Sequence, residues 1–244
     1  MAMKLPRAML IDMDDTILSA YGHPEIAWNH IAAEFKGEFG PLSSHEVAAA
    51  VLTSARSFWS AAGAEWRLQL EEARRIVVRD AFAALVTDGH SLPTELATRI
   101  ADRFTAYREE EMFIFPGAHD AIDALRGLGV KLALVTNGGA VTQRAKVERF
   151  ELAHRFHHIQ IEGEHGFGKP EERAYLHAMD ALGVTAKDTW MIGDNLEWEV
   201  VTPQRLGIYS IWIDVHDDGL PEGSAVKPDR IIRSLSELVP LAHK

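Results

Sequence analysis

Three carboxylates and a hydroxyl crowd together where a short apolar segment ends near the start of the chain. Residues 9–11 are apolar, and Asp12, Asp14, Asp15 and Thr16 follow them directly. Like charges this close repel one another unless a cation or a positively charged side chain lies among them. Asp12 and Asp14 are two apart, so an extended backbone would project both to one side, where they can act on one bound group. The crowding favours chemistry over the alternative, an acidic turn with Asp15 or Thr16 as an N-cap residue.

Composition narrows the class of protein. The chain has 244 residues, of which 47% are hydrophobic and 25% charged, as in ordinary globular proteins. It has no cysteine, which excludes disulfides, thiolate metal sites and cysteine nucleophiles. The net charge of -11 argues against binding of a nucleic acid polymer. Because no apolar run reaches the length of a signal peptide core or a membrane span, we expect a soluble, cytoplasmic protein with no membrane partner. We expect it to be a monomer or a homodimer.

A long helical stretch follows the acidic segment. Apolar residues recur at steps of three and four from Ala27 onward, for about ninety residues after Leu18. Ser43 and Glu46 have the spacing of a capping box at the start of one helix. The periodicity predicts four helices, one of them running from Trp66 and stopping near Asp88-Gly89. These helices form an insert over residues 19–111.

From Phe113 the pattern changes to alternating strands and helices, which is typical of a parallel sheet with helical crossovers. Strands are predicted over 131–135, 158–161, 189–192, 208–215 and 229–232. Helices are predicted over 141–150, from Pro170 onward and at the C-terminus. The sequence therefore predicts a doubly wound, parallel-sheet α/β core formed by residues 1–18 and 112–244.

Polar residues also follow other predicted strands, where ligands gather in such a sheet. Thr136, Asn137 and Gly138 offer a hydroxyl and backbone amides suited to phosphate, although Asn-Gly is also a common turn. Lys169 precedes a predicted helix, where a surface role is the ordinary interpretation. Asp194 follows Gly193 and suits either a metal ligand or an N-cap. Each signal alone is weak.

Together, four such signals in a fixed order at four strand ends resemble the haloacid dehalogenase (HAD) superfamily. Its phosphatases carry Asp-x-Asp-x-Thr, then Thr or Ser, then Lys before Pro, then Gly-Asp with a later acid. The matching residues are Asp12, Asp14, Thr16, Thr136, Lys169 and Asp194. The resemblance covers about 150 residues of the core, and it implies a Rossmann-like HAD core in which the helical insert is a cap domain.

The resemblance implies a Mg²⁺-dependent phosphatase acting on small phosphate monoesters. Asp12 would be the nucleophile that forms an aspartyl-phosphate, and Asp14 the general acid and base. Asp12 and Asp194 would bind Mg²⁺ through side-chain oxygens and Asp14 through its main-chain carbonyl, with Glu199 in a supporting position. Lys169 would neutralise the phosphoryl group. The remaining phosphate ligands would be Thr16, Thr136, Asn137 and Gly138.

Three alternatives stay open. A 2-haloacid dehalogenase would lack the aspartate at position 14, because a halide leaves without a proton. A phosphomutase tends to have an aliphatic residue at position 16. A non-enzymatic module that accepts phosphate on Asp12 would be about half this length and would lack the helical insert.

Some residues depart from the common pattern or lack an assigned role. Asp15 stands where many HAD proteins have Gly or Asn, and Glu199 where they often have Asp. The tryptophan at 198 is expected to pack in the core. Twelve histidines include His154, His157 and His158 close together, but no zinc-binding spacing, so we expect exposed or locally bonded histidines.

Overall fold

The computed structural model describes residues 5–20, 22–86 and 91–239. Two compact units emerge, one from the described parts of 1–19 and 113–244 and the other from those of 20–112. We refer to them as the core unit and the insert unit. Among the described residues, no helix combines the length and apolar character needed to cross a bilayer.

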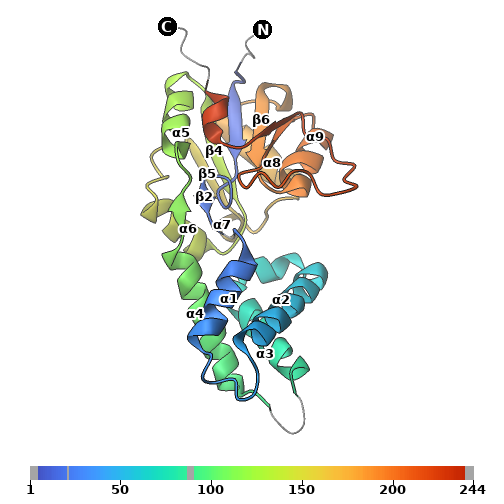
Figure 1. Cartoon of the computed structure of the whole chain (residues 1–244). Helices are drawn as coiled ribbons and strands as arrows, with labels where there is room; N and C mark the ends of the chain where they lie inside the picture. The colour runs from blue at the N-terminus through green and yellow to red at the C-terminus, as the bar shows by residue number, and fades with distance from the viewer. Residues whose placement is uncertain (1–4, 21, 87–90, 240–244) are drawn as a thin grey trace. The chain divides into compact units, whose positions relative to one another are not determined.

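The core unit contains a parallel sheet (Figure 1). In its described part six strands occur in the order β5-β4-β1-β6-β7-β8. Their bounds are Ala8–Ile11 for β1, Lys131–Thr136 for β4, His158–Ile161 for β5, Thr189–Gly193 for β6, Tyr209–Ile213 for β7 and Arg230–Ile232 for β8. Leu10 of β1 pairs with Ala133 on one side and Met191 on the other. Strand order therefore reverses at β1, and the crevice at a reversal is where such sheets bind ligands.

Helices cover both faces of this sheet, and Figure 1 shows α5 and α8 on opposite sides of it. They comprise α5 (Ala118–Gly127), α6 (Ala140–Arg149), α7 (Glu162–His165), α8 (Glu172–Leu182) and α9 (Thr202–Arg205), with short turns η2 (Ala186–Asp188), η3 (Leu196–Val201) and η4 (Leu235–Leu238). Alternate strand residues such as Leu10, Val135 and Met191 pack against Tyr175 and Leu182 of α8. The doubly wound α/β prediction is confirmed.

Two predicted helix boundaries are wrong in detail. The chain does not enter α8 at Pro170, because the Glu171 N–H closes a turn onto the Gly168 carbonyl at 2.9 Å and Glu171 itself is extended. Within the described residues, which end at 239, the expected C-terminal helix is the single turn η4. The apolar segment that predicted this helix is short. Pro240 follows in the sequence, and a proline disfavours helical geometry at the residue before it.

The insert unit contains the helices α1 (Pro24–Glu34), α2 (Ser44–Ala61), α3 (Leu70–Ala84) and α4 (Thr94–Glu110), and the short turn η1 (Ala64–Leu68). The capping box of Ser43 and Glu46 is confirmed, with both reciprocal hydrogen bonds present. Trp66 belongs to η1, so the prediction that it starts α3 is wrong. The predicted stop at Asp88-Gly89 lies outside the described residues. Trp28 stacks on Phe104 at 3.6 Å in the core of this unit.

The chain leaves and re-enters the core unit through a small antiparallel ribbon. Strand β2 (Leu18–Ser19) pairs with β3 (Phe113–Ile114), so that Ser19 lies opposite Phe113. The Phe115 N–H also donates to the Ile17 carbonyl at 2.9 Å. Because the two ends of the insert are paired neighbours, the insert is accommodated without interrupting the sheet.

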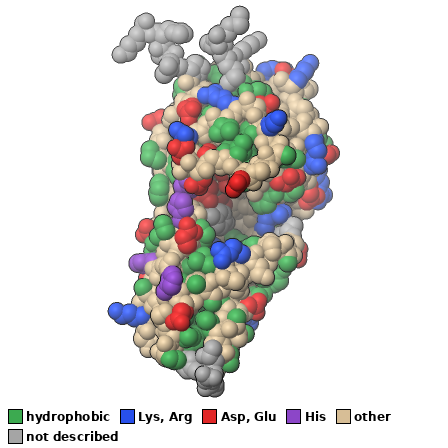
Figure 2. Space-filling view, turned by 45° about the vertical axis from the view of Figure 1, so that its right-hand side comes forward, with side chains coloured by type: hydrophobic (Ala, Val, Ile, Leu, Met, Phe, Trp, Pro, Cys, Tyr) green, Lys and Arg blue, Asp and Glu red, His purple; other side chains and the backbone are tan. Residues whose placement is uncertain are grey.

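The charged residues of the surface are mixed. On the face shown in Figure 2, Lys and Arg side chains are interspersed with Asp and Glu over the described residues.

Candidate active site

A fully buried lysine lies at the carboxyl ends of the central strands. Lys169 is 0% exposed, its ammonium forms an ion pair with Asp12 Oδ1, and its Nζ lies 2.7 Å from Glu199 Oε1. Asp12 directly follows β1, and its N–H continues the ladder by donating to the Ile192 carbonyl at 2.9 Å. The ordinary interpretation of Lys169 as a surface residue is thereby excluded.

The loop before α8 is held in place by Asn137, which follows β4. The Asn137 side chain donates from Nδ2 to the Lys169 carbonyl at 2.6 Å and accepts the Lys169 N–H on Oδ1 at 2.9 Å. Gly168 permits this approach, because a Cβ there would lie 2.6 Å from Asn137 Oδ1 and 2.8 Å from Glu162 Cδ. These contacts fix the backbone from which the lysine side chain extends.

Glu199 reaches the same site from the π-helix η3, which follows β6. Its Oε2 accepts the Asn195 N–H at 2.9 Å, while Oε1 faces Lys169. The Asn195 side chain caps η3 by accepting two backbone N–H groups, those of Glu197 and Trp198. Irregular π turns of this kind are frequent at functional sites. Trp198 is half-buried, and its carbonyl accepts the Tyr175 hydroxyl at 2.5 Å.

Burial and crowding alter the acid–base properties of this carboxylate cluster. Burial raises the pKa of Asp12, an effect that Lys169 opposes. Burial also raises the pKa of Glu199 to about 7 and that of Asp194 well above its ordinary value, and Asp12 adds to both shifts. Burial opposes the charge on Lys169, but the carboxylates of Asp12 and Glu199 more than offset it and raise its pKa.

This cluster fits a hard divalent cation. Three carboxylates, those of Asp12, Asp194 and Glu199, share one ammonium, and burial makes their surplus negative charge costly. Mg²⁺ prefers oxygen ligands and needs only one or two carboxylates from the protein. The cluster therefore has the donor set that the sequence resemblance implies for Mg²⁺.

Asp14 has a different cationic partner from Asp12. Lys146 of α6 lies 2.8 Å from both Asp14 carboxylate oxygens, and Gln143 Nε2 donates to Oδ2 at 3.0 Å. The same Gln143 amide donates to Thr136 Oγ1 at 2.7 Å. Gln143 thus connects the acid predicted to transfer protons with the hydroxyl predicted to hold phosphate, and Lys146 supplies the countercharge of the acid.

The predicted phosphate ligands are in different surroundings. The Thr16 hydroxyl is buried and has no hydrogen-bond partner among the described residues. The Gly138 N–H donates to Glu162 Oε2 at 2.9 Å, and the Asn137 side chain is bonded to the Lys169 main chain. Phosphate binding by Asn137 and Gly138 stays a prediction, and for Asn137 it would have to use the main chain.

Gln143 and Lys146 were not identified from the sequence. Both belong to the helix that follows Thr136, three residues apart and therefore on one face. Both are buried, although polar residues at these positions are ordinarily exposed. The sequence signal that could have identified them is the spacing of two polar residues, three positions apart, in the helix directly after the predicted phosphate-binding loop.

Comparison with known proteins identifies the family. The family described as haloacid dehalogenase-like hydrolase matches residues 6–229. The chain belongs to the haloacid dehalogenase-like hydrolase family. A phosphoserine phosphatase of Thermus thermophilus is 35% identical over 146 residues, which are 59% of this chain and 57% of that protein. The chain spans about half the length of the first curated phosphatases that it matches, from 41% to 57% of them.

One HAD relative matches nearly the whole chain. The HAD-hydrolase YfnB of Bacillus subtilis is 27% identical over 238 residues, 97% of this chain and 95% of YfnB. A crystal structure of YfnB bound to magnesium has a TM-score of 0.69 at 25% identity and covers 96% of this chain and 97% of its own. The prediction of a HAD fold with a helical insert is confirmed.

The Lys146–Asp14 ion pair leads to a stability prediction. Its two side chains are only 10% and 12% exposed, so Lys146→Met would leave a nearly buried carboxylate without its cation. We expect the free energy of unfolding to fall by about 3 kcal/mol, measured by urea denaturation. Arg144→Met on the same helix removes the more exposed pair with Glu164 and should cost less than about 1 kcal/mol. Equal losses of unfolding free energy in the two variants would contradict the prediction that the Lys146–Asp14 pair contributes more than an exposed pair.

Without a bound metal, repulsion within the carboxylate cluster should lower the stability of the protein. The folded pKa of Glu199, about 7, exceeds its ordinary value of 4.5, so the folded state holds the proton to higher pH than the unfolded state. Stability of the metal-free protein should therefore fall as pH rises between these values.

At about pH 7.5 and without metal, Asp194→Asn should raise Tm, because it removes a carboxyl group whose ionisation burial and the neighbouring carboxylates oppose. Each 1 kcal/mol of unfolding free energy corresponds to roughly 2–4 °C in Tm. Mg²⁺ should raise Tm in the wild type and much less in this variant. Asp180→Asn, at an exposed position on α8, serves as the matched control. A metal-free Tm that is lower in Asp194→Asn than in Asp180→Asn would refute the predicted repulsion.

Proposed function

We propose that this protein is a Mg²⁺-dependent phosphatase of small phosphate monoesters that works through an aspartyl-phosphate on Asp12. The observation that carries the proposal is the fully buried Lys169 ammonium between Asp12 and Glu199. Such a group is suited to a reaction that brings a doubly charged phosphate beside a carboxylate nucleophile. The surplus of carboxylates around it is suited to a metal that shares the neutralisation.

The metal would be held by the side chains of Asp12 and Asp194 and by the main-chain carbonyl of Asp14. When bound, it supplies positive charge that lets a phosphate anion approach the acidic cluster. Lys169 supplies a second positive charge from a fixed position. Binding of the phosphoryl group thus depends on two cationic groups.

The chemistry proceeds in two displacements. The Asp12 carboxylate attacks phosphorus in line, and the bond from phosphorus to the ester oxygen breaks as the aspartyl-phosphate forms. Asp14 gives a proton to the departing oxygen. It then takes one from the water that attacks the same phosphorus, and the bond from phosphorus to Asp12 breaks, which frees the Asp12 carboxylate and releases inorganic phosphate. Lys146 and Gln143 contact the Asp14 carboxylate and orient it in the ionised form, which is the form that takes the proton from water.

Hydroxyl groups bind the remaining phosphoryl oxygens. Thr16 has a buried hydroxyl that finds no partner among the described residues, and a phosphoryl oxygen would satisfy it. Thr136 accepts a hydrogen bond from Gln143 and donates a long one, 3.4 Å, to the Asn137 carbonyl, which a phosphoryl oxygen would replace as acceptor. The phosphoserine phosphatase relative is consistent with a small phosphate ester as substrate.

A metabolite screen with active-site variants tests this function. The purified protein should hydrolyse p-nitrophenyl phosphate and a subset of small phosphate esters, and EDTA should abolish the activity. Asp12→Asn should remove turnover, because its amide cannot attack phosphorus. The neighbouring Asp15→Asn should retain activity within about tenfold, since its backbone has a φ of 54° that Asn tolerates.

Asp14→Asn distinguishes proton transfer from a structural role. Turnover of alkyl phosphates should fall by about 10²–10⁴, whereas p-nitrophenolate leaves with little need for a proton and should be affected less. Equal losses for both leaving groups would argue against the acid role. Activity that persists in Asp12→Asn would refute the covalent mechanism.

The insert unit is proposed to select the substrate. Because Ser19 and Phe113 are paired neighbours, a short glycine-containing turn can join them in place of residues 20–112. The shortened protein should keep some hydrolysis of p-nitrophenyl phosphate but lose its ranking among natural esters. Circular dichroism would establish that the core is folded. An unchanged ranking in a folded core would exclude this role for the insert.

A further inference from the structure

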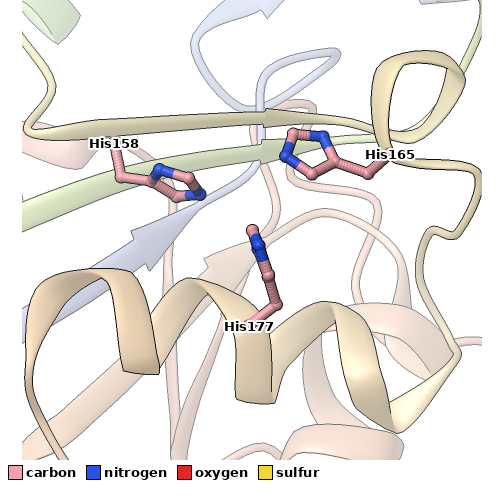
Figure 3. Close-up of side chains that lie close together, drawn as sticks. All are labelled: His158, His165 and His177. Atoms are coloured by element: carbon pink, nitrogen blue, oxygen red, sulfur yellow. The ribbon is translucent and has the colours of Figure 1, made fainter.

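Three histidines from three different elements gather at the β5 edge of the core sheet (Figure 3). His158 begins β5, His165 ends α7 and His177 lies within α8. One ring nitrogen from each lies within 4.8 Å of the corresponding nitrogens of the other two. Strand β4 separates β5 from β1, and none of the three histidines belongs to the carboxylate cluster.

The hydrogen bonds of His165 and His177 determine which nitrogen carries the proton. His165 Nδ1 lies 3.1 Å from the Ile161 carbonyl, which can only accept, so Nδ1 is the donor. His177 Nδ1 lies 2.8 Å from Gln160 Oε1. The amide of Gln160 is oriented by its own donation to the Ala174 carbonyl at 2.9 Å, which leaves the oxygen facing His177. Both rings therefore have their unprotonated lone pair on Nε2.

The third ring lacks a partner at the corresponding atom. His158 Nε2 is buried and forms no hydrogen bond with the described residues. A buried nitrogen without a partner requires an explanation, and a ligand bound by all three rings would supply one.

The arrangement has the features of a metal site built from imidazoles. Histidines that bind a metal usually donate their other ring N–H to a carbonyl or carboxylate, as His165 and His177 do here. Tetrahedral zinc with bonds of about 2.1 Å separates its ligand atoms by roughly 3.4 Å. The rings would need to close by at most about 1.4 Å, and the exposed His177 has room to move.

We propose that His158, His165 and His177 form a three-histidine site for a divalent transition metal, with Zn²⁺ as the expected ion and an exchangeable water as the fourth ligand. Imidazole nitrogens favour Zn²⁺, Co²⁺ and Ni²⁺, whereas Mg²⁺ prefers oxygen. This site is independent of the proposed phosphatase reaction.

The position of the site gives it a structural consequence. His165 and His177 flank the segment that carries Lys169, four residues before it and eight after it. A metal bound to both would join α7 to α8 across the base of that segment and attach them to β5. Zn²⁺ should therefore raise the thermal stability of the protein while Mg²⁺ occupies the carboxylate cluster.

Titration calorimetry and Co²⁺ spectroscopy on the full chain test the proposal, with excess Mg²⁺ present throughout. We expect one Zn²⁺ per chain and, with Co²⁺, the intense visible absorption of a four-coordinate nitrogen site. Octahedral Co²⁺ on carboxylates absorbs far more weakly, so the spectrum separates the two sites.

His177→Ala should weaken Zn²⁺ binding by more than about 100-fold, since loss of a ligand exceeds the 10–100-fold cost of losing an outer partner, and should abolish the Co²⁺ spectrum. His165→Gln should do the same. His154→Ala, an exposed histidine near His158 in sequence, is the matched control and should bind as the wild type does.

His177 is exposed, so its replacement should leave the metal-free Tm nearly unchanged. Absence of one-to-one Zn²⁺ binding, or wild-type binding in both His177→Ala and His165→Gln, would overturn the proposal. Zn²⁺ binding that is lost in Asp194→Asn but kept in His177→Ala would assign the ion to the carboxylate cluster and would overturn it equally.

Discussion

The buried ammonium of Lys169 is the interaction on which the site depends. A charged group with no solvent exposure requires close countercharges. Asp12 provides one from the end of β1, and Glu199 provides the other from η3, which follows β6. Without the lysine, two buried carboxylates would face each other, and their repulsion would oppose the packing of η3 against the sheet. The lysine therefore stabilises the carboxyl edge of the sheet as well as supplying charge.

The surrounding polar groups form one connected network with that lysine. Asn137 binds the Lys169 backbone through both its carbonyl oxygen and its amide, so the loop after β4 and the loop before α8 cannot move separately. Glu162 accepts the Gly138 N–H and fills the space beside Gly168. These buried hydrogen bonds restrict the backbone from which the Lys169 side chain extends.

Sequence periodicity was sufficient for the architecture, because a parallel α/β sheet and an amphipathic helical insert have distinct apolar periods. It failed where single residues decide a boundary, as at Pro170 and Trp66. Side-chain partners across the fold were harder still. Lys146 and Gln143 meet Asp14 across about 130 positions of sequence, and that meeting depends on the direction in which α6 presents its face.

The histidines show the same limit more sharply. His154, His157 and His158 are close in sequence, yet His157 Nδ1 accepts the Leu132 N–H at 3.1 Å and has a local structural role. His158 instead meets His165 and His177, which the topology of β5, α7 and α8 brings together. A search for short metal-binding spacings cannot find a cluster whose members come from three separate elements.

The two departures from the common HAD pattern have physical explanations in the backbone. Asp15 has a φ of 54°, a left-handed conformation that Gly, Asn and Asp adopt more readily than other residues. Glu199 spans from η3 to Lys169 with one oxygen and to the Asn195 N–H with the other. An aspartate, one methylene shorter, would have to give up one of these contacts if η3 kept its position.

Gly193 and Glu199 are thus linked requirements. A Cβ at position 193 would collide with the Glu199 stem and lie 3.0 Å from Asp12 Cβ, so the longer acid occupies the space that the glycine leaves free. The glycine that loosens the end of β6 therefore has a specific reason to be there. It allows the carboxylate of a later turn to pass close to the strand and reach the buried lysine.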